Sequence, residues 1–262
     1  MYDMNDKEIV AQAALKFVKN NTIIGLGTGS TANYFIDGLA QKIKNENLDI
    51  KVVASSTTSQ IKAIEAGLAY ISLDQIETID LYVDGADEVA DLDKYPSIKF
   101  ALKGRGYDLI REKLLAYTSD RFIIIGDQSK IVKNLGDNFP IPIEISPIAW
   151  RITKRLIENK LSDCLVSCDL RKNTAGDGFA ITSYGNLVLD CKIKSIEDIG
   201  HYEISDEISN TPGVFEHGIF GGERSDEEHV YAVLIANKGE VEVYGPGVYI
   251  DEEEAAIFDS FT

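Results

Sequence analysis

The chain has 262 residues, a length that suits one large domain or a large domain with a smaller one. Its formal net charge of -17 argues against sequence-independent binding to nucleic acid or to an anionic membrane, because both partners are negatively charged. Three cysteines, an odd number, argue against a secreted disulfide framework, and we interpret Cys164, Cys168 and Cys191 as packing residues.

The N-terminal segment predicts an amphipathic helix. Asn5 is a candidate N-cap with Glu8 three residues later, and apolar side chains of residues 9–18 recur on one face. The segment lacks the basic and apolar regions of a secretory leader, and no apolar run in the chain approaches the length of a membrane span. We therefore expect a cytoplasmic protein.

Four short apolar segments are each followed by a polar or glycine-rich loop. Each segment with its loop occupies residues 22–31, 51–59, 79–88 or 122–130. Short continuous apolar strands alternating with amphipathic helices predict an α/β fold, with a Rossmann-like, mostly parallel sheet covered by helices on both faces. Ligands of such sheets bind beyond the carboxyl ends of the strands, where all four loops would lie.

The first of these loops is rich in glycine and hydroxyl side chains. It differs from the dinucleotide-binding fingerprint and lacks the lysine of a P-loop. Gly27 and Gly29 allow the backbone to approach an anion, and Thr28, Ser30 and Thr31 would lie at a helix N-terminus that favours phosphate. The pattern favours a small phosphorylated ligand over a nucleotide, and the alternative is a tight turn with a Ser/Thr cap.

Three carboxylates and one lysine form the second candidate cluster. Asp84 and Asp87 follow a predicted strand on a glycine-containing turn, Lys103 opens a later loop, and Glu112 lies on the helix after it. A base, an acid and a cation are what proton transfer beside a carbonyl requires. The alternative is that the two aspartates only cap a surface turn and that Glu112 is solvent-exposed.

The later part of the chain predicts a smaller α+β domain. Prolines 140, 142 and 147 mark the transition to it. Helices are expected at residues 149–157 and 196–209, and strands at 164–166, 180–182 and 187–189. This order suggests a ferredoxin-like unit.

The predicted domain boundaries follow from the return of the chain to the main sheet. A strand at residues 231–235 would rejoin that sheet, and residues 241–243 would pair beside it. This gives an α/β domain of residues 1–136 and 223–262 and a smaller domain of residues 137–222. The acidic residues 251–254 are expected to be solvated.

Seven segments in the same order resemble the metal-independent ribose-5-phosphate isomerases of type A. The matching segments are residues 25–31, 82–88, 111–113 with Lys103, 127–130, 140–144, 185–190 and 212–220. The resemblance implies a reversible aldose–ketose isomerisation of ribose 5-phosphate and ribulose 5-phosphate without a metal or other cofactor. It also implies a homodimer.

The resemblance also implies a role for each matched residue. Glu112 would move a proton between C1 and C2 through an enediolate, Lys103 would lie beside the sugar oxygens, and Asp84 and Asp87 would serve ring opening and hydroxyl proton transfer. The residues expected to hold the substrate and its phosphate are Thr28, Gly29, Ser30, Thr31, Gly85, Ala86, Gly104, Arg105, Gly106, Lys130 and Lys7.

The loop after Lys103 departs from the glycine-rich pattern of the family. It carries Arg105, Tyr107 and Asp108. Arg105 either points outward, so that only its backbone serves the site, or reaches the substrate and changes which sugar phosphate fits. Another sugar-phosphate isomerase, a related deaminase or lactonase, and a sugar-phosphate effector-binding protein are the alternative functions. A deaminase or lactonase would require a catalytic histidine near the strand edge. A regulator would normally carry a basic helix-turn-helix segment.

Overall fold

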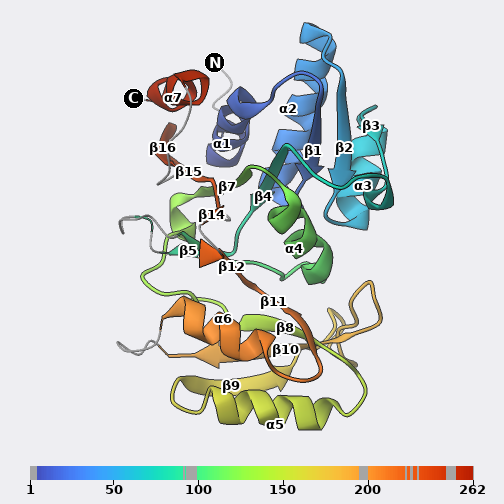
Figure 1. Cartoon of the computed structure of the whole chain (residues 1–262), viewed down its shortest axis with the longest axis vertical. Helices are drawn as coiled ribbons and strands as arrows, with labels where there is room; N and C mark the ends of the chain where they lie inside the picture. The colour runs from blue at the N-terminus through green and yellow to red at the C-terminus, as the bar shows by residue number, and fades with distance from the viewer. Residues whose placement is uncertain are drawn as a thin grey trace.

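The computed structural model describes residues 5–90, 92, 99–194, 200–221, 223–224, 227–228, 230–245 and 252–261. Its largest element is a seven-stranded sheet in the order β16-β15-β7-β4-β1-β2-β3, in the upper part of Figure 1. The strands are β16 (Glu240–Tyr244), β15 (Ala232–Asn237), β7 (Phe122–Asp127), β4 (Leu81–Gly85), β1 (Thr22–Leu26), β2 (Ile50–Ala54) and β3 (Ala69–Tyr70). Every neighbouring pair is parallel except β15 with β16.

Helices cover both faces of this sheet. On one face lie α1 (Asp6–Ala14), α2 (Ser30–Glu46) and α3 (Thr57–Glu65), and on the other lies α4 (Leu109–Thr118). Strand residues alternate between the two apolar layers, since Ile123 and Ile125 pack with Phe35 while Ile124 packs with Leu115. The predicted Rossmann-like sheet with helices on both faces is confirmed.

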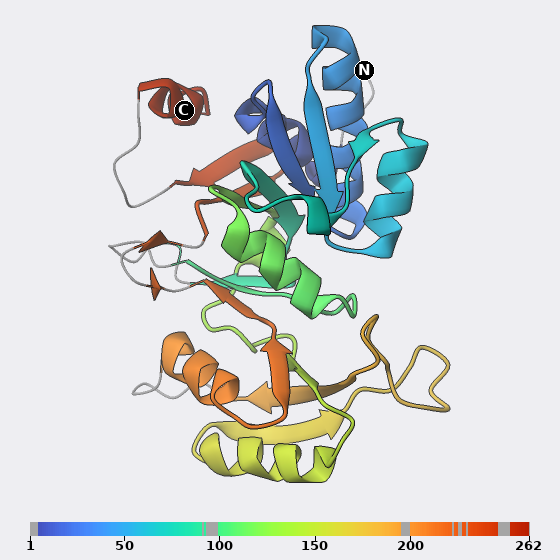
Figure 2. The same ribbon diagram turned by 45° about the vertical axis from the view of Figure 1, so that its right-hand side comes forward.

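A second sheet of four strands lies below the first in Figures 1 and 2. Its order is β11-β8-β10-β9, and all pairs are antiparallel. The chain runs through β8 (Ile141–Ile145), α5 (Trp150–Lys160), β9 (Leu165–Leu170), β10 (Leu187–Ile193), α6 (His201–Ser209) and β11 (Val214–His217). Both helices pack on one apolar layer with the sheet, which is the predicted ferredoxin-like arrangement.

Shorter elements complete the fold. Strands β12 (Ile219–Gly221), β6 (Phe100–Leu102) and β5 (Glu88–Ala90) form a small sheet, and β13 (Glu223–Arg224) pairs with β14 (Glu227–Glu228). Short 3-10 helices are Leu15–Phe17, Leu73–Gln75 and Gln128–Lys130. No helix in the described part of the chain is long and apolar enough to span a membrane. The division of the chain into two domains at residues 136 and 222 stays a prediction.

One predicted strand was wrong, one strand was not predicted, and one predicted helix is confirmed where the structure describes it. Residues 180–182 make only an isolated bridge, between Ile181 and Leu187, rather than a strand. The proline-containing segment at β8 is a central strand; Pro142 pairs with Asp190 but lies beyond the register of β11, where its carbonyl accepts from Gly218. Of the predicted helix at 196–209, residues 196–199 lie outside the described part of the chain, and the helix begins at His201.

All three cysteines pack in the apolar core of the second sheet, as predicted, and two of them are also bonded to each other, which was not predicted. Cys164 is buried and free, as a packing residue should be. Cys168 and Cys191 form a disulfide between β9 and β10, with their Cα atoms 4.1 Å apart. The two are direct partners in the antiparallel ladder, a proximity that their separation of 23 residues does not reveal.

The acidic segment near the C-terminus begins a helix and is not simply solvated. Asp251 lies outside the described residues, but α7 spans Glu252–Asp259. Glu254 accepts a hydrogen bond from Tyr231 and pairs with Arg121 at 3.3 Å. The helix also places an aromatic ring, Phe258, against the main core.

Candidate active site

One cavity of about 540 Å³ gathers nearly all the predicted site residues at the carboxyl ends of β1, β4 and β7. This is the size and location typical of a small-molecule site in such a sheet. Its lining residues are Lys7, Thr28, Gly29, Ser30, Thr31, Gly85, Ala86, Asp87, Lys103, Gly104, Arg105, Gly106, Glu112, Ile125, Asp127, Ser129 and Lys130. Asp84 alone among the predicted residues lies beneath the cavity instead of lining it.

One end of the cavity is the N-terminus of α2. Gly29 precedes the helix with a φ of 111°, and Lys7 of α1 donates to Ser30 Oγ at 2.8 Å. The Thr28 hydroxyl instead lies within a group of serines after β2, 2.7 Å from Ser56 Oγ. A helix N-terminus beside a lysine can hold a phosphate, and Thr28 supports the loop from behind.

Three residues that line the cavity were not predicted to contact a ligand. Ile125 and Asp127 lie on β7, Ser129 follows that strand, and all three line the cavity with Lys130. Asp127 accepts hydrogen bonds from both the backbone and the hydroxyl of Ser129, which closes the turn that carries Lys130. For Asp127 and Ser129 the signal was the loop 126–130, which was recognised as a loop after a strand. Of this loop, only Lys130 was predicted to contact the substrate.

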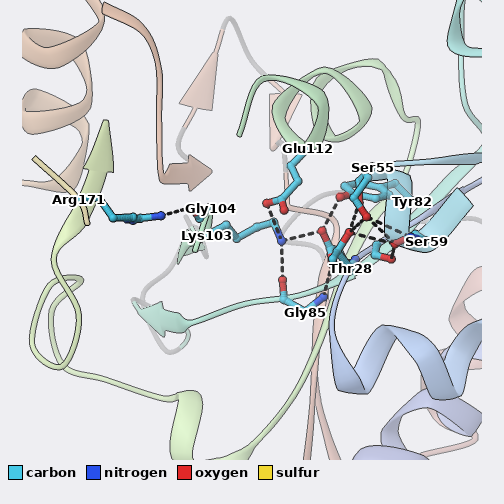
Figure 3. Close-up of polar contacts among 12 residues, drawn as sticks. Thr28, Ser55, Ser59, Tyr82, Gly85, Lys103, Gly104, Glu112 and Arg171 are labelled. Carbon is cyan, nitrogen blue, oxygen red and sulfur yellow. Dashed lines mark hydrogen bonds and ion pairs between the residues drawn. The ribbon is translucent and has the colours of Figure 1, made fainter. Parts of the chain in front are cut away.

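The opposite end holds a buried Lys103, whose amine contacts two carboxylates. Lys103 Nζ lies 2.6 Å from Asp84 Oδ2, 2.7 Å from the Gly85 carbonyl oxygen and 3.4 Å from Glu112 Oε2 (Figure 3). Lys103 and Glu112 are each 4% exposed and Asp84 is fully buried. Glu112 Oε2 is buried without a hydrogen bond from any described residue, and the Lys103 amine is its charged neighbour.

Asp84 is saturated with donors. Besides Lys103, it accepts from the Tyr82 hydroxyl and from the backbone N–H groups of Thr28 at 2.9 Å and Gly85 at 2.7 Å. Four donors compensate a buried carboxylate well. Asp84 therefore fixes Lys103 and the glycine-rich loop together.

The pKa shifts follow from this burial. Burial raises the pKa of Glu112 from 4.5 to about 7, against the opposing pull of Lys103 and with further help from Asp84. Burial alone would lower the pKa of Lys103, but Asp84 and Glu112 outweigh it and raise that pKa. Lys103 is thus cationic at neutral pH while Glu112 is poised to gain or lose a proton.

Asp87 and Arg105 lie at the rim of the cavity. Burial raises the pKa of Asp87, and the charges of Lys103, Arg105 and Lys130 oppose that rise. Arg105 Nη1 is 3.9 Å from Asp87 Oδ1, and its guanidinium lies 4.2 Å from the centre of the Phe139 ring. Its side chain, 56% exposed, lines the cavity instead of pointing away from it.

The described histidines lie elsewhere. His217 Nε2 is within hydrogen-bond distance of two serine hydroxyls of α6, and His201 accepts from the Leu135 N–H. Within the described residues, no three His, Cys, Asp or Glu side chains are grouped to hold a metal ion.

A helix N-terminus that faces a glutamate–lysine pair across one cavity is the arrangement of an α/β enzyme for acid–base chemistry on a small anionic substrate. Comparison with known proteins identifies the family within this class of enzymes. The family model of ribose 5-phosphate isomerase A (phosphoriboisomerase A) matches residues 51–235. The chain belongs to the ribose 5-phosphate isomerase A family.

Individual relatives agree with this assignment. A ribose-5-phosphate isomerase A of Thermococcus kodakarensis is 41% identical over 215 residues, 82% of this chain and 89% of the relative. The solved ribose 5-phosphate isomerase A of Methanocaldococcus jannaschii has a TM-score of 0.79 and 34% identity, covering 92% of this chain and 98% of that one. A solved D-ribose-5-phosphate isomerase in complex with phospho-erythronic acid has a TM-score of 0.79 and 35% identity, covering 92% and 100%.

Proposed function

We propose that this protein interconverts ribose 5-phosphate and ribulose 5-phosphate through an enediolate. The observation that carries the proposal is the Glu112–Lys103 pair, 3.4 Å apart at one end of a cavity whose other end is a helix N-terminus. The family's name supports the substrate, and the relative that holds phospho-erythronic acid supports a site for a phosphorylated sugar acid. These names favour the isomerase over the deaminase, lactonase or regulator alternatives.

Glu112 is the base. Its carboxylate takes the proton from C2 of the open-chain aldose, and the C–H electron pair forms the enediolate. The O2 hydroxyl proton passes to O1, and the proton on Glu112 returns to C1 to give the ketose. A single carboxyl that both accepts and donates needs a pKa near the working pH, and a pKa of about 7 meets this need.

Lys103 stabilises the negative charge that develops on the sugar oxygens. Its amine is held by Asp84 and the Gly85 carbonyl, so it needs no rearrangement when the charge forms. Asp84 acts through Lys103, because it lies beneath the cavity and its oxygens are occupied by donors.

Asp87 serves the hydroxyl protons and ring opening. It lines the cavity, and its raised pKa favours proton exchange with the sugar hydroxyls. Arg105 beside it contacts the same end of the substrate. The phosphate lies at the other end, on the first turn of α2. The groups expected to contact the substrate and its phosphate there are Lys7, Thr28, the Gly29–Thr31 backbone N–H groups, the Ser30 hydroxyl and Lys130.

The remaining expectations are part of the same proposal. The reaction needs no metal or other cofactor, because the base and the cation are both protein side chains. We propose that the protein works in the cytoplasm as a homodimer and does not bind nucleic acid, in keeping with its net charge of -17. Sedimentation that finds only monomer would contradict the dimer.

An optical assay for ketopentose phosphate appearing from ribose 5-phosphate, run with a chelator present, tests the function. Wild type should be active, and Glu112→Gln should lose about a hundredfold or more in kcat, because the amide cannot take the C2 proton. Glu65→Gln is the matched control, since Glu65 is exposed on α3 and does not line the cavity.

Equal activity of wild type and Glu112→Gln would reject Glu112 as the base. Loss of wild-type activity in chelator would reject the metal-free mechanism, and an inactive wild type would reject the function.

A further inference from the structure

Arg171 joins the second sheet to the loop that carries Lys103. It follows β9 directly, and its Nε and Nη2 atoms donate to both carboxylate oxygens of Asp190 on β10, at 2.6 to 3.1 Å. Its Nη1 atom donates to the Gly104 carbonyl oxygen at 3.2 Å (Figure 3). The side chain is 11% exposed and does not line the cavity, so it does not contact the substrate.

The loop that accepts this hydrogen bond has an unusual backbone conformation at two residues. Gly104 has a φ of 96° and Tyr107 a φ of 71°, which a tyrosine rarely adopts. A Cβ at residue 104 would overlap the Leu109 side chain, so the backbone is pressed close to the start of α4. Such a conformation persists only when surrounding contacts hold it.

The segment after β9 supplies several of these contacts. Arg171 Cζ lies 5.5 Å from the centre of the Tyr107 ring. Asp108 is the N-cap residue of α4, yet its carboxylate makes no capping bond and accepts instead from Ser183 Oγ at 2.7 Å. The loop between Lys103 and Glu112 is thus held from the second sheet at both ends.

We propose that Arg171 is a positioning residue for the isomerase reaction, held by Asp190 and fixing the Gly104 carbonyl so that the neighbouring Lys103 amine stays opposite Glu112. The inference rests on the proposed function of the same cavity. Arginine suits the task because its planar guanidinium can bind a carboxylate with two donors while a third reaches the carbonyl. A lysine at this position has a single amine and cannot reproduce this arrangement of three donors.

The test compares wild type with Arg171→Gln, Arg171→Lys, Asp190→Asn and the double variant of Arg171→Gln with Asp190→Asn. For each protein we would measure kcat, KM for ribose 5-phosphate, and the inhibition constant of inorganic phosphate as a competitor. Arg155→Gln is the matched control, since Arg155 is exposed on α5 of the same sheet layer.

Arg171→Gln should lower kcat between about tenfold and a hundredfold, because displacing a reacting group by about 1 Å has effects of this size. The inhibition constant of phosphate should not change, because the phosphate end is built by α1, α2 and the loop after β7. Arg171→Lys should recover only part of the loss. The double variant should be no worse than Arg171→Gln, since Asp190 acts through Arg171.

Wild-type kcat in Arg171→Gln would overturn the inference. So would a parallel loss of kcat and phosphate affinity, which would indicate general damage to the fold, or full activity of Arg171→Lys. These outcomes leave the proposed function intact, which fails only if wild type does not isomerise ribose 5-phosphate.

Discussion

Asp84 shows how one buried residue organises the site without entering the cavity. A buried carboxylate is costly unless it is fully paired, and here Lys103 and the Tyr82 hydroxyl share one oxygen while two backbone N–H groups share the other. Burial raises the pKa of Tyr82, and the charges of Asp84 and Glu112 raise it further, so the phenol remains a donor at neutral pH. As a consequence, Lys103 stays charged beside Glu112, whose pKa lies near neutral pH.

The raised pKa of Glu112 predicts a pH-dependent cost in stability. The folded protein binds this proton with a pKa of about 7 and the unfolded chain with a pKa near 4.5, so the contribution of Glu112 to stability is greatest below pH 4.5 and falls as pH rises to 7. Lys103 stays protonated throughout, because its own pKa is raised. Between pH 5 and pH 8, the free energy of unfolding of Glu112→Gln should therefore rise relative to that of wild type by about 2–3 kcal/mol.

Urea unfolding of both proteins at several pH values measures this difference. Glu65→Gln should track wild type at every pH, since that side chain is exposed. A difference between Glu112→Gln and wild type that stays constant with pH would contradict the raised pKa.

At the scale of elements, the sequence predicts the strands that are continuously apolar. It does not predict the short strands whose pairing partners are distant in the chain. β1, β2, β4 and β7 were each recognised with the loop that follows, and this places most of the site at one sheet edge. β5 and β6 were not predicted because each has only three residues and forms a separate small sheet. β8 was not predicted either, because the prolines around it were interpreted only as marking the transition to the smaller domain.

Within the site, the sequence gives residue types but not always the direction of a side chain. Asp84 and Asp87 were predicted as an acting pair, yet only Asp87 lines the cavity. Alternation along β4 was a usable signal, because residues 82 and 84 share a face of the strand and their side chains meet there. The contact of Arg171 with Gly104 had no such signal, since 67 residues separate them.

The close approach of β1 to β4 predicts that Gly27 cannot carry a side chain. A Cβ at this position would overlap Asp84 Oδ1 and lie 2.5 Å from Asp84 Cα, which is backbone and cannot move aside. Gly27→Ala should lower the free energy of unfolding by about 1–3 kcal/mol, as overpacking does. It should also lower kcat at least about tenfold, because Asp84 holds Lys103.

Thermal unfolding and the isomerase assay measure the two effects. Gly178→Ala is the control, because its new Cβ would meet only the end of the Asn173 side chain, at 3.2 Å. Full activity in Gly27→Ala would mean that Asp84 does not depend on this contact.

At the scale of the whole molecule, both sheets contribute to one site. The seven-stranded sheet supplies the α2 N-terminus and Asp87, while the second sheet holds the loop of Lys103 through Arg171 and Ser183. A partly buried ion pair joins the layers at a further point, where Lys113 of α4 lies 3.1 Å from Glu216 of β11 and donates to the Ile219 carbonyl. Because Lys113 follows Glu112 directly, this attachment of α4 also fixes the position of Glu112 in the cavity.

The C-terminal helix does not line this cavity; it packs against the main core and lies beyond residues 51–235, which match the family. Phe258 packs against Phe17 with ring centres 5.4 Å apart and against Tyr231 at 5.9 Å.

Phe258→Ala should lower the free energy of unfolding by about 2 kcal/mol, less than for a fully buried ring, because the side chain is only partly buried. Its kcat below the unfolding temperature should equal that of wild type, since no residue of α7 lines the cavity. Thermal unfolding measured beside Glu252→Gln, an exposed position at the start of the same helix, separates the apolar contact from the helix itself. An unchanged melting temperature in Phe258→Ala would mean that α7 adds no stability through its aromatic face, and a fall in kcat would tie this helix to the site after all.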